Sequence, residues 1–163
     1  MIPFIHFYLV NNFKGFEMYK PKHFKVQELV SPDIFNQRGS KAIELLDPRL
    51  LETLDKLREE LGRPITINNW LWGGNFKQRG LRDRSFYKSD KAYVDSLSQH
   101  KYGRAVDFDV KGMSAPEVRK FIYKNREKFP FITFVETDIN WVHIDCRNSE
   151  FTVWSPDRGF VNE

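Results

Sequence analysis

The segment SQHKYGRAVDFDV, residues 98–110, decides the fold because it joins a glycine turn to a strand with two unlike faces. Residues 104–110 alternate apolar and polar side chains, which is typical of a half-buried strand. One face of this strand is apolar, and the other carries Asp107 beside the small Ala105. His100 lies just before the turn. The segment therefore predicts a strand whose polar face lies close to a histidine.

A second segment, WVHID at residues 141–145, has the same alternation. Its apolar side chains share one face, and His143 and Asp145 share the other with a tryptophan. If the two strands are neighbours, His100, Asp107 and His143 meet around one point. Two imidazoles and a carboxylate, with one position left open, are typical of a catalytic zinc site. Asp145 is then placed to orient one of these ligands from behind.

The remaining patterns predict an α+β fold, with helices early and strands late. Pro48 begins a helix that carries leucines at helical spacing and ends at Gly62. A capping box from Ser114 to Glu117 begins another helix. We expect a small antiparallel sheet that carries the metal site and packs against these helices. Its further strands are expected at residues 65–69, at 132–136 in a hairpin with 141–145, and at 151–154 along an edge.

Length and composition fit one domain. The chain has 163 residues, 40% of them apolar, which suffices for a hydrophobic core. Cys146 is the only cysteine, so an intrachain disulfide and a cysteine-rich zinc cluster are excluded, and we expect a small buried residue there. No apolar run reaches the length of a membrane-spanning helix. Residues 1–17 are expected to be an N-terminal extension, with Met18 as an alternative start, before a single domain at 18–163.

The positive charge of the chain is concentrated in one segment. The whole chain carries a net charge of +4, whereas residues 77–104 hold eight Lys or Arg and three Asp, a net charge of +5. This placement favours a local anionic partner, although a solvated loop has the same composition. Residues 70–99 show no periodicity and are long for a loop in a compact domain, which favours a functional loop.

The string Ser-x-His-x-x-Gly-x-Ala-x-Asp at residues 98–107, followed by Trp-x-His-x-Asp at 141–145, resembles the zinc peptidases of the M15 family. These are D-alanyl-D-alanine carboxypeptidases and dipeptidases and L-alanyl-D-glutamate endopeptidases, including phage endolysins. The resemblance covers residues 24–147. It implies a Hedgehog/DD-peptidase-like fold, one Zn²⁺ per chain held by His100, Asp107 and His143, and hydrolysis of a peptide bond in the peptidoglycan stem. Whether the chain is a carboxypeptidase or an endopeptidase stays open.

The catalytic acid departs from the family pattern. Family members often carry it three residues before the last histidine, where this chain has Asn140. Glu136 and Asp138 are the nearby acids. We favour Glu136 as the general base, because a strand end holds a side chain more rigidly than a turn does.

The family arginine is also displaced. Its usual place here reads WLWGG at residues 70–74, so Arg79 and Arg82 are the candidates to replace it. We favour Arg82 as the group that stabilises the oxyanion or holds a substrate carboxylate, although either arginine could simply cover the surface. Ser98 and Trp141 are expected to bind substrate; a purely structural role is open for both.

The N-terminus, MIPFIHFYLV, has no basic n-region and no small-residue cleavage site, so no signal peptide is expected. An enzyme of this kind would stay cytoplasmic until released by a partner, or would be virion-associated if phage-encoded. The alternative function is a non-catalytic wall- or nucleic-acid-binding domain of the same fold. Asn140 and the basic segment favour it, but one carboxylate is few for the Mg²⁺ site of a nuclease, and nucleic acid is the less expected partner.

Overall fold

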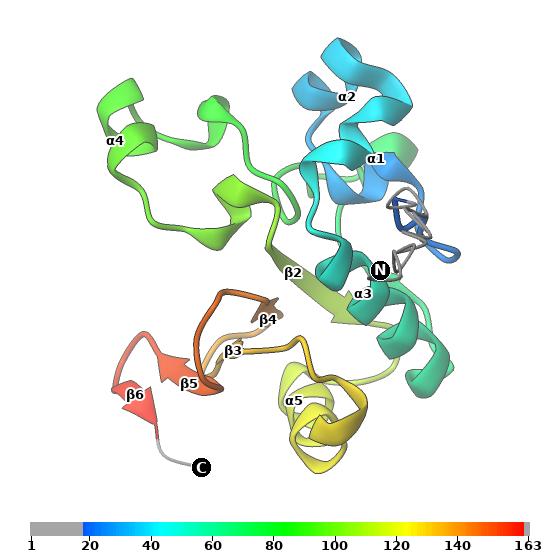
Figure 1. The fold of residues 1–163 in the computed structure, drawn as a ribbon, viewed down its shortest axis with the longest axis vertical. Helices are drawn as coiled ribbons and strands as arrows, with labels where there is room; N and C mark the ends of the chain where they lie inside the picture. Colours follow the sequence, from blue (N-terminus) through cyan, green and yellow to red (C-terminus); the bar gives the residue numbers. More distant parts are fainter. Residues whose placement is uncertain (1–17, 162–163) are drawn as a thin grey trace, which may run out of the picture.

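The computed structural model describes residues 18–161; the expected extension at 1–17 lies outside them. The fold is α+β, with a six-stranded mixed sheet in the order β1-β2-β4-β3-β5-β6 (Figure 1). The strands are β1 (Ile65–Thr66), β2 (Ala105–Val110), β3 (Phe134–Glu136), β4 (Val142–Asp145), β5 (Thr152–Ser155) and β6 (Gly159–Val161).

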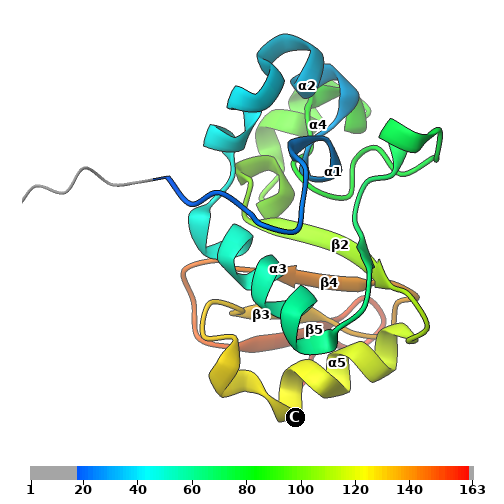
Figure 2. The ribbon, with the colours of Figure 1, turned by 90° about the vertical axis from the view of Figure 1, so that its right-hand side faces the viewer.

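The helices fall into two groups. Figure 2 shows α3 and α5 on the same side of the strands, whereas α1, α2 and α4 lie together beyond β2. The α-helices are α1 (Val26–Leu29), α2 (Pro32–Arg38), α3 (Pro48–Leu61), α4 (Asp90–Asp95) and α5 (Ala115–Lys124). Short 3-10 helices occur at η1 (Gly39–Leu45), η2 (Trp70–Trp72), η3 (Arg84–Phe86), η4 (Gln99–Tyr102) and η5 (Arg126–Lys128).

The two long helices begin and end where their capping residues predict. The side chain of Asp47 accepts a hydrogen bond from the Arg49 amide at the start of α3, and Gly62 ends the helix in the left-handed conformation. Ser114 and Glu117 form the capping box of α5. Both helices turn their apolar side chains toward the sheet, which buries its apolar face with them. The core shared by α3, α5, β2 and β4 includes Leu50, Leu54, Leu57, Val118, Ile122, Val106, Phe108, Val142 and Ile144.

The opposite face of the sheet carries a row of polar side chains. Asp107 of β2 lies directly across from His143 of β4, and His143 lies across from Glu136 of β3. Residues that are partners across neighbouring strands project on the same face. Three chemically reactive side chains therefore stand side by side on three adjacent strands, as the alternation in residues 104–110 and 141–145 predicts.

The sheet differs from the expected antiparallel one in its outer strands. β5 pairs in parallel with β3, and β6 rather than β5 forms that edge. Residues 146–151 leave the end of β4 and pass the start of β3, where Thr152 pairs with Phe134. This connection only has to step over one strand, a distance that a few extended residues can span. At the other edge, a strand was expected at residues 65–69, but only Ile65–Thr66 form one, as β1.

A buried arginine holds the turn between β3 and β4. Arg119 of α5 is 5% exposed, and its guanidinium donates hydrogen bonds to the carbonyl oxygens of Ile139 and Trp141. The turn contains Asp138 with a φ of 59°, in the left-handed region that non-glycine residues seldom adopt. Arg119 thus fixes the turn that connects Glu136 to His143.

Replacing Arg119 by alanine is expected to destabilise the protein by about 1–3 kcal/mol, because two carbonyl groups lose their charged donor. Urea unfolding followed by circular dichroism measures this loss. The exposed neighbour Lys120 supplies the matched control, Lys120→Ala, which should cost less than about 0.5 kcal/mol. Equal stabilities of the two variants would contradict the role given to Arg119.

Candidate metal centre

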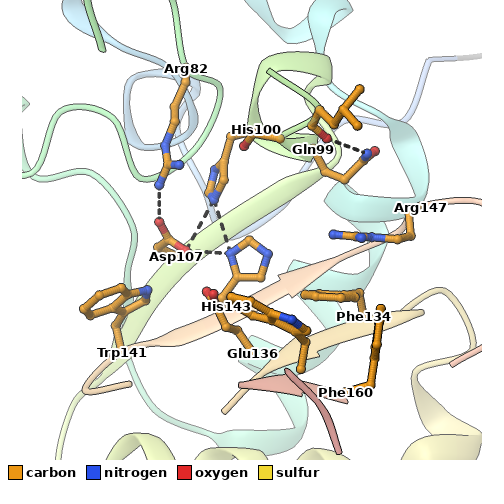
Figure 3. Close-up of a pocket in the computed structure, with 13 residues that line it drawn as sticks. Arg82, Gln99, His100, Asp107, Phe134, Glu136, Trp141, His143, Arg147 and Phe160 are labelled. Carbon is orange, nitrogen blue, oxygen red and sulfur yellow. Dashed lines mark hydrogen bonds and ion pairs between the residues drawn. The ribbon is translucent and has the colours of Figure 1, made fainter. Parts of the chain in front are cut away.

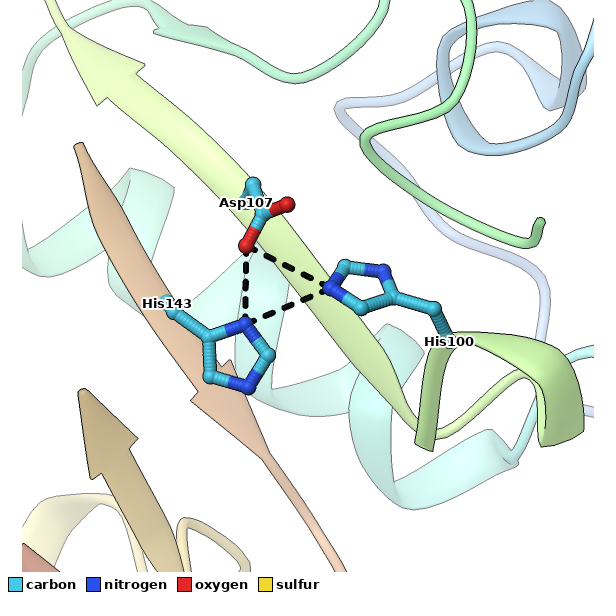
Figure 4. Close-up of side chains that lie close together, drawn as sticks. All are labelled: His100, Asp107 and His143. Atoms are coloured by element: carbon cyan, nitrogen blue, oxygen red, sulfur yellow. Dashed lines mark hydrogen bonds and ion pairs between the residues drawn. The ribbon is translucent and has the colours of Figure 1, made fainter. Parts of the chain in front are cut away.

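His100, Asp107 and His143 converge on one point, as predicted (Figure 4). His100 Nε2 lies 3.3 Å from His143 Nδ1 and 3.3 Å from Asp107 Oδ1. His143 Nδ1 lies 2.8 Å from the same carboxylate oxygen. All three side chains are buried, and together they could hold a metal ion.

The spacing of these atoms fits a small tetrahedral ion. Metal–ligand bonds of about 2.0–2.1 Å in tetrahedral geometry place neighbouring ligand atoms about 3.3 Å apart. Two of the three distances have this value, and the third needs to lengthen by a few tenths of an ångström. Two imidazole nitrogens and one carboxylate oxygen are compatible with zinc, whereas Mg²⁺ prefers oxygen ligands. Three protein ligands leave one position for a water molecule or substrate.

The protein backbone orients His100. Its Nδ1 lies 2.8 Å from the carbonyl oxygen of Gly80. Because a carbonyl can only accept, the proton sits on Nδ1 and Nε2 keeps its lone pair for the site. Burial lowers the pKa of His100, which favours this neutral form. Gly80 lies so close to α1 that a Cβ there would meet the Leu29 carbonyl oxygen at 2.1 Å. Glycine at position 80 thus permits the approach that orients the ligand.

His143 is held from the opposite side of its ring. Its Nε2 lies 3.5 Å from Asp145 Oδ2, so Nδ1 is the atom directed at the site. Arg147 in turn binds the Asp145 carboxylate through two nitrogens. Burial opposes a charge on His143, but its hydrogen bonds with Asp107 and Asp145 outweigh burial and raise its pKa to about 9. A metal that binds Nδ1 must therefore displace a proton at neutral pH.

Arg82 secures the second oxygen of the carboxylate ligand. Its Nη2 donates to Asp107 Oδ2 at 2.6 Å (Figure 3). Its Nε donates to the Gln78 carbonyl, and its guanidinium stacks on Phe86. The contact with Oδ2 leaves Asp107 Oδ1 facing the two histidines, where it could bind a metal ion. Arg79 instead pairs with Asp109, outside the cleft. Of the two candidate arginines, the fold brings Arg82 into the site, where its role on substrate stays a prediction.

A cleft with a volume of about 620 Å³ opens over the three ligands. Glu136, Ser98 and Trp141 line it, so the fold brings together every site residue predicted from the sequence. Glu136 is half-buried, and burial raises the pKa of its carboxyl group. The competing acid Asp138 is exposed and forms an ion pair with Arg158.

Sequence reasoning missed several residues that line this cleft. They are Leu97, Gln99, Phe134, Arg147, Trp154 and Phe160. Strand alternation could have found two of them, because Phe134 precedes Glu136 by two positions and Arg147 follows Asp145 by two. Gln99 is adjacent to the ligand His100 in the chain. Trp154 belongs to β5, which the sequence placed at an edge of the sheet, and Phe160 belongs to β6, which the sequence did not indicate.

The basic segment 77–104 is partly neutralised within the fold. Acids outside the segment pair with three of its arginines: Arg79 with Asp109, Arg82 with Asp107, and Arg104 with Asp47. These contacts reduce the charge that the segment offers to nucleic acid.

Cys146 is buried, as predicted, and burial raises the pKa of its thiol to about 12. Thiolate chemistry at this residue is therefore disfavoured.

Within residues 18–161, no helix has the length and apolar character needed to cross a membrane.

Comparison with protein-family models, with curated proteins and with solved structures found no match to this chain. The site itself combines a buried His–Asp–His cluster, a half-buried glutamate and an arginine in one open cleft.

Proposed function

We propose that this protein is a zinc-dependent peptidase of the M15 type, which hydrolyses a peptide bond in the peptidoglycan stem. The observation that carries the proposal is the row formed by Asp107, His143 and Glu136 on adjacent strands. It places a candidate proton acceptor directly beside a His–Asp–His cluster at the floor of a cleft. Structural zinc sites are closed by four protein ligands, whereas this cluster supplies three.

His100, Asp107 and His143 would hold the zinc ion through Nε2, Oδ1 and Nδ1. When bound, zinc supplies a Lewis acid that polarises the scissile carbonyl and increases the acidity of water. The protein keeps the ligands in position through hydrogen bonds from behind: Arg82 holds Asp107, and Asp145 faces His143 Nε2. Such outer contacts fix ring orientation and strengthen metal binding.

Glu136 is proposed as the general base. Its carboxylate takes a proton from the attacking water and returns it to the leaving amine. Burial raises its pKa, which brings its proton affinity closer to that required near neutral pH. Asn140, at the usual family position of the acid, has a neutral amide that cannot act as a base, and it does not line the cleft. The rigid end of β3 supplies the carboxylate in its place.

Arg82, Ser98 and Trp141 are proposed to act on the substrate. Arg82 lies beside Asp107 in the cleft and would stabilise the negative charge that develops on the carbonyl oxygen during attack. Ser98 offers a hydroxyl group at the end of the long 70–99 segment. Trp141 is 39% exposed and presents its ring to the cleft. The 70–99 segment supplies one wall, so it determines which stem-peptide bond reaches the metal.

Digestion of purified muropeptides, followed by mass spectrometry, tests this proposal. Zinc-loaded protein is expected to cleave them, and a chelator should abolish cleavage. Release of alanine from the carboxyl end identifies a carboxypeptidase, whereas separation of alanine from the glutamyl residue identifies an endopeptidase. Zinc binding at one ion per chain without cleavage would overturn the proposal in favour of a non-catalytic wall-binding domain.

A further inference from the structure

Arg147 lies at the end of the cleft away from Arg82, and it is fixed on two sides (Figure 3). Its Nε donates to Asp145 Oδ1 at 2.8 Å and its Nη2 donates to Asp145 Oδ2 at 2.5 Å. The guanidinium also stacks on Phe134, with its central carbon 3.7 Å from the ring centroid. One edge and one face of the group are therefore occupied, which leaves little rotamer freedom.

The other edge of the guanidinium is open. Within residues 18–161, Nη1 has no hydrogen-bond acceptor, and the side chain is 35% exposed and lines the cleft. Arg82 also has acceptors on its Nε and Nη2, but its side chain is only 18% exposed, so it is less accessible to a ligand than Arg147. A planar guanidinium held in one orientation is well suited to bind a carboxylate.

Apolar side chains surround this end of the cleft. Phe160 of β6 is 79% exposed and Leu97 of the long loop is 82% exposed, yet both line the same cleft as Arg147. Trp154 of β5 completes the wall. A ligand that enters here covers apolar surface and displaces water from the guanidinium, which strengthens a charged hydrogen bond.

We propose that Arg147 is a specificity-determining residue that binds a carboxylate of the peptide substrate through its open edge. The inference rests on the proposed function, because it takes a peptide to be the ligand of the cleft. Asp145 balances the charge of Arg147, and Asp107 balances that of Arg82. With zinc bound, the divalent charge then exceeds the single negative charge of Glu136. The cleft therefore favours a substrate that carries an extra negative charge.

Peptide pairs that differ in one carboxylate test the inference. The probes are L-Ala-γ-D-Glu-L-Lys-D-Ala, the same peptide with the glutamyl α-carboxylate as an amide, and the peptide with a C-terminal amide. Binding is measured by calorimetry to zinc-loaded Glu136→Gln protein, so that no probe is consumed. Amidation of one of the two carboxylates is expected to weaken binding by about tenfold to a hundredfold, the value of a charge-assisted hydrogen bond.

The acid-to-amide ratio is the factor by which amidation weakens binding of the peptide. When Arg147→Met is added to the Glu136→Gln protein, this ratio should fall to less than twofold, and Arg147→Lys should give an intermediate ratio. Arg126→Met is the matched control, since Arg126 also stacks on a phenylalanine but does not line the cleft. It should keep the full ratio. If Arg147 only supports Asp145, its variants lower zinc content or weaken all probes equally, and the ratio stays unchanged.

The two proposals fail in different ways. Muropeptide cleavage by wild-type protein, with an unchanged ratio in Arg147→Met, overturns the role of Arg147 and leaves the peptidase standing. Selective binding of the acid that depends on Arg147, without cleavage, overturns the peptidase and keeps the carboxylate site. Absence of binding to all three probes overturns the inference.

Discussion

Replacing His143 by alanine is expected to remove the metal. Elemental mass spectrometry should find close to one zinc ion per chain in the wild-type protein and almost none in His143→Ala. Loss of a hydrogen-bond partner behind a ligand typically weakens metal binding by about 10–100-fold, and loss of the ligand atom itself should cost more. Nδ1 of His143 lies within 3.3 Å of both other ligand atoms, and among the described residues no further His, Cys, Asp or Glu belongs to the cluster.

His23 supplies the matched control for this experiment. It is also a histidine beside a carboxylate, because its Nε2 lies 3.1 Å from Glu59, but its side chain is 37% exposed and does not line the cleft. His23→Ala should keep its zinc. A second measurement separates lost binding from lost folding. Zinc at 100 times its dissociation constant stabilises a protein by about 2.7 kcal/mol. The wild type should gain this stability on zinc addition and His143→Ala should not.

Zinc retained at full occupancy in a folded His143→Ala protein would contradict the proposed centre. Asp145→Asn extends the series, because Asp145 faces Nε2 of His143 without belonging to the cluster. We expect it to bind zinc more weakly than the wild type and more tightly than His143→Ala. This order follows from the distinction between a ligand and the group that orients it.

The local sequence pattern predicted that Asp107 and His143 come together, because side chains alternate between the two faces of a strand. In residues 104–110 and 141–145, this alternation separates the apolar side chains from Asp107 and His143. Burial of the apolar face then leaves one register in which both polar residues face the same way. Glu136 follows from the same rule, one strand further along. The helix caps at Asp47 and Ser114 are equally local signals, and both helices begin where they predict.

The outer part of the sheet could not be predicted in this way. A local sequence pattern does not determine which strand becomes the neighbour of another. The four residues Thr152–Ser155 would fit a parallel partner as well as an antiparallel one. β6 has only three residues, and Phe160 within it is exposed. The guanidinium of Arg147 is held by Phe134 and Asp145, which lie on neighbouring strands. Its proposed role could therefore be inferred only once the pairing of these strands was known. The same holds for Arg82, which reaches Asp107 across 25 positions of the chain.

Replacing Glu136 by glutamine is expected to abolish turnover and to leave the metal in place. The amide keeps the size of the side chain but cannot accept the proton of the attacking water. Loss of a general base typically lowers the rate by about 10²–10⁴-fold. Glu136 donates no ligand atom to the cluster, so zinc content should stay close to one ion per chain. Muropeptide turnover and elemental analysis of the same sample separate these two effects.

Asp138→Asn provides the test of the rival acid. Asp138 sits two positions after Glu136, but its carboxylate pairs with Arg158 and its side chain does not line the cleft. Its replacement should therefore leave turnover within about twofold of the wild type, a free-energy difference of about 0.4 kcal/mol. Active Glu136→Gln beside inactive Asp138→Asn would assign the base to Asp138 and require the β3–β4 turn to rearrange on substrate binding. Activity in both variants would mean that neither acid is the base, and the row of Asp107, His143 and Glu136 would then serve metal binding alone.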